Sequence, residues 1–263
     1  MGEMPTISLP SSELFVVGPF SITNSVITTF TVSFILIILA FLIRRKAGVV
    51  PSRLQVVFES IMNFILDKMI MAFGSRERAL KFFPLYFTVF LFLLIGNQFM
   101  LIPFAESIVT ADGINLFRSP ASDYSLPIVF TLFILILSHI LALAIRPIKH
   151  IGSFIKVEQF FKMKSIKDLP MAFLDFFLGL LDIIGEFAKL ASLSTRLFGN
   201  MFAGSIIVGI IASLTTFTQF LVPIPFIALG ILSGVVQAFV FVMLGSLYIS
   251  APLNAVKPVE ETN

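Results

Sequence analysis

The chain has 263 residues, of which 57% are hydrophobic and 13% charged, with a formal net charge of +3. A soluble domain carries about twice that charged fraction, so the composition indicates an integral membrane protein. The small net charge does not support nucleic-acid binding. There is no cysteine, and two histidines, His139 and His150, are too few for a histidine-rich metal site. With no Walker loop, zinc-ligand spacing or nucleophile elbow, we expect no bound nucleotide, metal or cofactor.

The apolar runs are about 20 residues long, which is the length of a spanning helix and not of a barrel strand. We therefore predict an all-α polytopic membrane protein with a single membrane domain, residues 1–263. The first run ends in a stop-transfer cluster, Arg44 to Lys46, so it is a retained helix and not a removed signal. The predicted crossings are residues 23–43, 82–103, 126–145, 171–213 and 224–250, with a basic cytoplasmic loop at 146–170.

The run at 52–73 is expected to lie flat on the membrane surface. Its polar residues recur every four positions on an otherwise apolar helix: Gln55, Glu59, Asn63 and Asp67. Basic clusters flank both ends, at 44–53 and 76–81, which places both ends on the cytoplasmic side. An interfacial amphipathic helix fits this pattern better than the alternative, a normal span with some polar packing.

Loop charges predict the orientation. The N-terminal tail carries acids and no basic residue, and the loop at 104–125 has three acids against a lone Arg118, so both lie outside. The loop at 146–168 holds six Lys or Arg residues and lies inside. The N-terminus is therefore expected outside and the C-terminus in the cytoplasm.

The run at 171–213 would form a helix of about 65 Å, twice the hydrocarbon thickness. A tight turn at 198–200 would divide it into two spans, but would expose backbone groups to lipid. One long, tilted helix is the better interpretation.

Ionisable and amide side chains line this helix within an arc of about 80°. They are Asp175, Asp182, Glu186, Lys189, Arg196 and Asn200. Glu186 and Lys189 are spaced for an internal ion pair. Arg196 is different, because an arginine near the bilayer centre costs at least ~3 kcal/mol and no carboxylate follows it in the membrane segments. We expect its counter-charge on another chain, and Gln237 of the last helix beside it.

The segment Leu193 to Gly204, read as LSTRLFGNMFAG, closely resembles the signature of subunit a of F-type ATP synthases. The run QAFVF from Gln237 resembles the family's pattern in the last helix. Asn97 followed by Leu-Ile-Pro, and Pro120 to Asp123, resemble its outer hairpin. The resemblance extends over most of the chain.

The resemblance implies a non-catalytic, ion-translocating stator in a bacterial plasma membrane, surrounded by lipid. Its partners would be a c-ring, against which the last two long helices tilt, and peripheral-stalk b subunits. Arg196 would release the ion from a ring carboxylate and block direct leakage, with Asn200 and Gln237 beside it. An inner half-channel would be lined by Asp175, Asp182, Glu186 and Lys189.

The chain departs from the family pattern at Ser205, Gly230 and Met100, where acids or histidine are usual. The expected outer half-channel therefore uses other residues: Ser205, Ser233 and Tyr248, with Glu106 or Asp123 near its mouth. The coupling ion, proton or sodium, stays open, because its binding site lies on the ring.

Two other functions stay open. A self-contained channel or secondary transporter would use Arg196 to bind an anionic substrate. A structural assembly subunit would have lost conduction altogether.

Overall fold

The computed structural model describes residues 12–18, 20–46, 52–99, 108–110, 115–120, 123–145, 147, 150, 152, 169–214 and 223–254. Most of this part forms six long helices: α1 (Asn24–Lys46), α2 (Arg53–Phe73), α3 (Arg76–Phe99), α4 (Ser125–Ile145), α7 (Leu169–Leu214) and α9 (Pro223–Asn254). The all-helical class of the protein body is thus confirmed. An antiparallel hairpin, β1 (Glu13–Val17) and β2 (Phe20–Thr23), precedes α1 and was not predicted. Gly18 turns this hairpin with a φ of 63°, a conformation that suits glycine.

Among the described residues, α1, α3, α4 and α9 are long and apolar enough to cross a membrane. Half of the apolar stretch of α3 is buried inside the chain, whereas only 11% of that of α1 is buried. Thus α3 is a central helix, and α1 presents most of its apolar surface outward. The predicted crossing by α7 and the flat position of α2 stay predictions.

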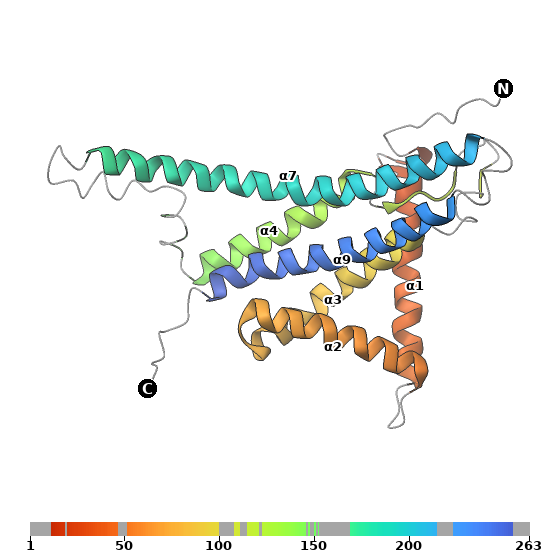
Figure 1. The fold of residues 1–263 in the computed structure, drawn as a ribbon, viewed down its shortest axis with the longest axis horizontal. Helices are drawn as coiled ribbons and strands as arrows, with labels where there is room; N and C mark the ends of the chain where they lie inside the picture. The colour runs from red at the N-terminus through yellow and green to blue at the C-terminus, as the bar shows by residue number, and fades with distance from the viewer. Residues whose placement is uncertain are drawn as a thin grey trace.

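The helices run in two main directions (Figure 1). α7, α9 and α2 follow the long axis of the molecule, whereas α1 runs across it. α9 contacts α2, α3, α4 and α7, so it connects the amphipathic helix on one side with the polar helix on the other. The position of α7 is therefore determined mainly by α4 and α9.

The junction between α2 and α3 differs from the sequence prediction. Ser52 caps the start of α2, where its hydroxyl accepts a hydrogen bond from the Gln55 N–H. Gly74 ends the helix in the left-handed conformation, with φ 64°. α3 then begins at Arg76 and not at residue 82. The charged residues of the flanking basic cluster are good helix formers, and Glu77 pairs with Lys81 one turn later at 3.1 Å.

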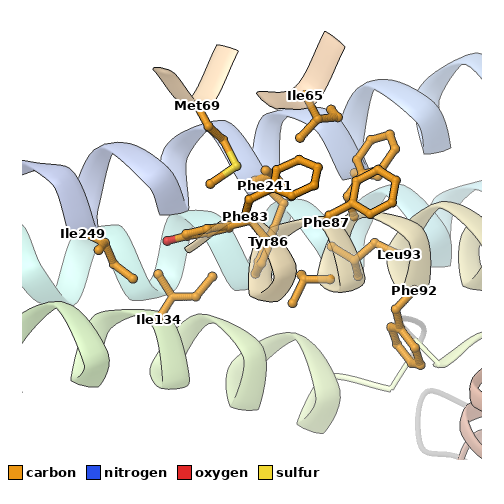
Figure 2. Close-up of a cluster of buried hydrophobic side chains, with 14 of the residues drawn as sticks. Ile65, Met69, Phe83, Tyr86, Phe87, Phe92, Leu93, Ile134, Phe241 and Ile249 are labelled. Carbon is orange, nitrogen blue, oxygen red and sulfur yellow. The ribbon is translucent and has the colours of Figure 1, made fainter. Parts of the chain in front are cut away.

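Aromatic side chains of α3 form the centre of the core (Figure 2). The rings of Phe83 and Phe87 stack with centroids 5.1 Å apart, and Phe58 of α2 meets Phe87 edge-on at 5.3 Å. Tyr86 is fully buried and lies where α9 comes close at Gly245. The absence of a side chain at Gly245 allows α9 to pack closely on α3 and α4.

α2 has three distinct faces. One packs into the core with Ile65 and Met69, both fully buried. The predicted polar stripe faces away from the core, and Gln55 donates to Glu59 at 2.8 Å within it. A third face exposes large apolar side chains: Val56, Val57, Phe64 and Met71. Apolar and polar faces side by side on one exposed helix are typical of a helix at a membrane surface.

Candidate functional site

Arg196 lies on α7, which is one uninterrupted helix, so a tight turn at 198–200 is excluded. Leu193 and Leu197, near Arg196 on the helix, are buried against the rest of the chain, whereas Arg196 is exposed. Within the described residues, no acidic side chain forms an ion pair with Arg196. An arginine in an apolar helix without an acidic partner in the described part of its own chain fits the expectation of a counter-charge from another chain.

Tyr124, directly before α4, holds the turn of α7 that carries Arg196. Its hydroxyl lies 2.8 Å from Thr195 Oγ1 and 3.4 Å from Ser194 Oγ, and its ring meets Phe198 edge-on at 5.1 Å. The hydrogen bonds with Ser194 and then Thr195 lower the pKa of Tyr124. Sequence reasoning missed this residue, because nothing local to Tyr124 indicates a contact with α7.

We expect Tyr124→Phe to lower the thermal stability of the detergent-solubilised chain by about 1 kcal/mol, because it removes these hydrogen bonds but keeps the ring. Tyr124→Leu also removes the edge-on contact with Phe198, so it should lower the melting temperature further. Thermal unfolding of both variants and the wild type checks this order. Equal melting temperatures for all would show that the contact does not hold α7 in place.

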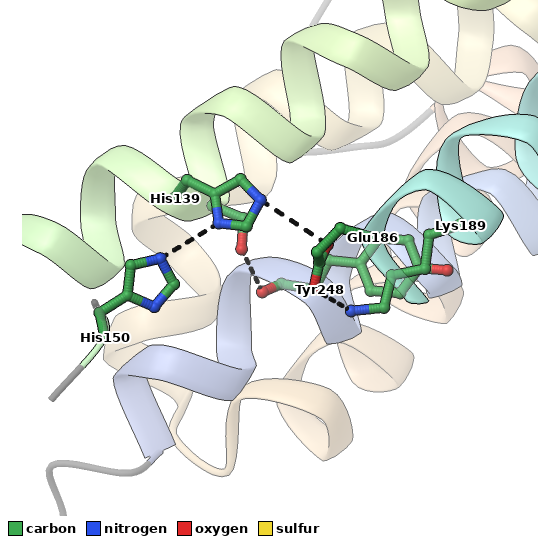
Figure 3. Close-up of polar contacts among 6 residues, drawn as sticks. His139, His150, Glu186, Lys189 and Tyr248 are labelled. Atoms are coloured by element: carbon green, nitrogen blue, oxygen red, sulfur yellow. Dashed lines mark hydrogen bonds and ion pairs between the residues drawn. The ribbon is translucent and has the colours of Figure 1, made fainter. Parts of the chain in front are cut away.

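A second polar cluster joins α4, α7 and α9 (Figure 3). Its members, called here the histidine–glutamate cluster, are His139, His150, Glu186, Lys189 and Tyr248. Lys189 Nζ lies 2.6 Å from Glu186 Oε1, which confirms the predicted pair. His139 Nε2 lies 3.6 Å from Glu186 Oε2, and His139 Nδ1 lies 3.2 Å from His150 Nε2. Lys189 Nζ also lies over the Tyr248 ring, 5.3 Å from its centroid.

The helices hold this cluster through their own contacts. The Ser138 hydroxyl donates to the Tyr248 carbonyl oxygen at 2.7 Å and ties α4 to α9 beside it. Burial lowers the pKa of His150, the nearby His139 lowers it further, and Glu186 raises it. From the sequence, both histidines were expected only to be too few for a metal site, and this contact between them was not predicted. One signal could have found His139, because it is the only ionisable side chain in the apolar run 126–145.

The two residues of α9 assigned to an outer pathway lie far apart. Tyr248 lies beside Lys189, which was assigned to the inner pathway, whereas Ser233 lies fifteen positions earlier on α9 (248 minus 233), or about 22 Å along the axis. Tyr248 therefore belongs spatially with the inner group. Asp182 is exposed on α7, one turn before Glu186.

Asp123 makes contacts that stabilise the fold. Its Oδ1 accepts hydrogen bonds from the backbone N–H and the hydroxyl of Ser125, at 3.1 and 2.9 Å, so it caps the start of α4. Its Oδ2 accepts a hydrogen bond from the Ser25 hydroxyl of α1 at 3.3 Å. Burial lowers the pKa of the nearby Arg118, and Asp123 raises it. Asp123 thus joins α1 to α4.

Gln237 is buried, with 5% of its surface exposed, and its Nε2 has no hydrogen-bond partner among the described residues. No hydrogen bond joins it to Arg196 in that part of the chain. Nearby, Asn97 Nδ2 donates to the Gly234 carbonyl oxygen at 3.4 Å, where α3 meets α9. A buried amide of this kind needs a water molecule or a further polar group.

Four of the expected site positions cannot be compared with the sequence prediction. The side chains of Asp175, Asn200 and Ser205, and the whole of Glu106, lie outside the described residues.

The fold and this site define a polytopic helical membrane protein with ionisable side chains placed along one long helix. The family model for the ATP synthase A chain matches residues 26–250, and the chain belongs to this family. It is therefore an ion-translocating subunit of the membrane sector of an ATP synthase, without ATP chemistry of its own.

Individual relatives are similar over most of their length. The chain is 32% identical to "ATP synthase subunit a, sodium ion specific" of Propionigenium modestum, over 92% of this chain and 78% of that protein. It is 31% identical to ATP synthase subunit a of Moorella thermoacetica, over 90% and 94%. It is 28% identical to ATP synthase subunit a 2 of a Bradyrhizobium strain, over 96% and 99%.

Proposed function

We propose that this chain is the stator that passes ions to and from a rotating c-ring, with Arg196 controlling the exchange. The observation that carries the proposal is the exposed guanidinium of Arg196 on an apolar helix, with no acidic partner in the described part of its own chain. A ring carboxylate supplies the missing counter-charge. Near the cation the carboxylate's pKa falls by about one to three units, so the ring releases its ion there. The fixed positive charge also repels a cation moving directly between the two half-channels.

The polar residues divide into two groups along α7 and α9. Asp175, Asp182, Glu186 and Lys189 precede Arg196 on α7 and form the inner half-channel, together with Tyr248, which lies against Lys189. Asn200, Gln237, Ser205 and Ser233 border Arg196 and the outer half-channel. The buried Nε2 of Gln237, which has no hydrogen-bond partner among the described residues, supports this position, because it is a site for water at membrane depth. Glu106 and Asp123 lie nearer the outer mouth, where Asp123 also caps α4.

The shape of the chain suggests how it lies in the membrane. α1 has 23 residues, or about 35 Å, and matches an upright span. α7 has 46 residues, or about 69 Å, and runs across the direction of α1, so it crosses the membrane obliquely. With α2 flat on the cytoplasmic surface, this gives one membrane domain with five crossings in a bacterial plasma membrane. The N-terminus lies outside, and peripheral-stalk b subunits complete the stator.

A self-contained transporter for an anionic substrate is less well supported. A cavity of about 470 Å³ lies between α1, α3 and α9, lined by apolar side chains and Gln98. Arg196 is not among its lining residues, so the cavity offers no positive charge to an anion. No observation on the described residues favours this function.

Reconstitution tests the proposal. Liposomes containing this chain alone should show background proton and sodium flux under an imposed membrane potential. Liposomes containing the assembled membrane sector, with the ring, should conduct. Transport of an anion by the chain alone would refute the proposal and support the transporter. Equal cation flux with and without the ring would also refute it, because a stator needs a ring carboxylate to carry the ion.

A further inference from the structure

His139 has a partner at each of its ring nitrogens. Nδ1 faces His150 Nε2 at 3.2 Å, and Nε2 faces Glu186 Oε2 at 3.6 Å (Figure 3). These groups come from three parts of the chain: α4, the segment that follows it, and α7. An imidazole held between a base and a carboxylate can accept a proton at one nitrogen and release another proton from the other nitrogen.

We propose that His139 relays protons between His150 and Glu186, so that the ion passing this side of α7 to Arg196 is a proton and not a sodium ion. The inference rests on the proposed ion-conducting function and specifies its ion. Glu186 lies ten positions before Arg196 (196 minus 186), or about 15 Å along α7. The relay therefore forms the part of the inner half-channel farther from the ring site.

The ligands of the cluster suit a proton and not a sodium ion. Hard cations bind oxygen atoms, whereas this route passes through the ring nitrogens of His139 and His150. The one carboxylate of the relay, Glu186, already has the Lys189 ammonium 2.6 Å from its Oε1. That positive charge repels a second cation but leaves Oε2 facing His139, where a proton can be exchanged.

The transfer balances without any other reactant. Protonated His150 gives its Nε2 proton to Nδ1 of neutral His139, and His139 gives its Nε2 proton to Oε2 of Glu186. One positive charge then leaves His150, and the Glu186 carboxylate becomes neutral. His139 is left with its proton on Nδ1, and the starting tautomer returns when Nδ1 gives a proton to water and Nε2 takes one from water, which changes no net charge. Run backwards, the same steps carry a proton from Glu186 to His150.

The surroundings keep this exchange reversible. Among the described residues, the charged and titratable groups near His139 are His150 beyond α4, Glu186, Lys189 and, one turn earlier, Asp182 on α7, and Tyr248 on α9. Lys189 and Glu186 offset each other, so the cluster carries little net charge when both histidines are neutral. Burial and the neighbouring His139 lower the pKa of His150, and Glu186 raises it; the net lowering favours the neutral imidazole, so His150 passes on a proton that it takes up.

The test uses the whole complex reconstituted in liposomes, with proton uptake and sodium uptake measured separately between about pH 5 and 8, around the ordinary histidine pKa. We expect the wild type to move protons with or without sodium. His139→Gln, an amide that cannot pass a proton from one atom to another, should slow proton uptake by about tenfold or more and flatten its pH dependence. Ile140→Ala is the matched control, because it alters the neighbouring position on α4, where the side chain is 56% exposed, and its pH profile should match the wild type.

The outcomes separate the relay from the proposed function. Sodium uptake in place of proton uptake by the wild type would overturn the inference, and so would a His139→Gln complex with wild-type rate and pH profile. Both results leave the stator function intact. A complete wild-type complex that moves neither ion would instead overturn the proposed function. If His139→Gln does not assemble, His150→Gln replaces it, since His150 lies outside the long helices. A His150→Gln complex with the wild-type rate and pH profile of proton uptake would then overturn the inference.

Discussion

The Arg196→Ala complex is expected to lose coupled ATP synthesis, with a rate about 10- to 1,000-fold below the wild type. The estimate follows from the shift of about one to three units by which a nearby cation lowers a carboxylate's pKa, since each unit is a factor of ten in proton release. Without the guanidinium the ring carboxylate keeps its ion as it passes α7. ATP synthesis by reconstituted complexes under an imposed potential measures the effect.

Arg196→Ala should also increase passive ion leakage, whereas it decreases ATP synthesis. Removing the fixed positive charge should raise passive ion leakage through the membrane sector, because nothing then repels a cation between the two half-channels. Arg196→Lys keeps the charge but loses the planar guanidinium, so it should limit the leak while restoring little synthesis. Ser194→Ala, two positions away and buried, is the control for local packing. Normal synthesis by assembled Arg196→Ala complexes would favour a structural assembly subunit instead.

Gly245→Leu is expected to destabilise the chain most among changes in its core. A Cβ atom at this position would lie 2.8 Å from Tyr86 Cε1 and 3.1 Å from Ile134 Cδ1. Tyr86 is fully buried and Ile134 is 2% exposed, so neither can move aside without displacing its own neighbours. Overpacking of this kind costs about 1–3 kcal/mol, and the larger leucine places the change at the upper end. Thermal unfolding in detergent measures the loss, and Gly245→Ala should give a smaller one.

Gly185→Ala is the matched control for that experiment. It also lies inside a long helix, but a Cβ there would meet nothing within 4 Å. Replacing glycine by alanine in a helix stabilises it by up to about 1 kcal/mol, so this variant should unfold at or slightly above the wild-type temperature. If Gly245→Leu unfolded at the same temperature as Gly185→Ala, the close contact of α9 with α3 and α4 would not exist.

Unlike these two glycines, Gly234 tests a softer contact. A Cβ there would lie 2.8 Å from Gln98 Nε2 and 3.1 Å from Asn97 Cβ. The end of the Gln98 side chain can rotate away, whereas Asn97 is 2% exposed and bonds the Gly234 carbonyl oxygen. The loss of stability caused by a side chain at Gly234 therefore depends on how far Asn97 can move. Asn97 belongs to the motif that resembles the family's outer hairpin.

Local pattern was sufficient to predict much of this protein. The lengths and periods of the apolar runs predicted the six helices, and the absence of any charged turn near residue 199 predicted that α7 is one helix. The three-residue spacing of Glu186 and Lys189 predicted their ion pair. These predictions succeed because they depend on neighbours within one helix, where geometry follows directly from spacing. α3 begins at Arg76, six residues before the predicted apolar run at 82–103, because the flanking charged residues continue the helix beyond its apolar part.

Contacts between helices were decided only by the tertiary structure. His139 meets Glu186, Tyr248 meets Lys189, and Tyr124 meets Thr195, each across separate helices. Such pairs depend on the crossing angle and relative rotation of packed helices, which close approach at positions such as Gly245 determines. The sequence by itself determined the helices and identified the arginine without a partner. Which titratable groups meet beside that helix depended on how the helices pack. The spacing of residues along one helix carries no information about how that helix is positioned and rotated against a second helix.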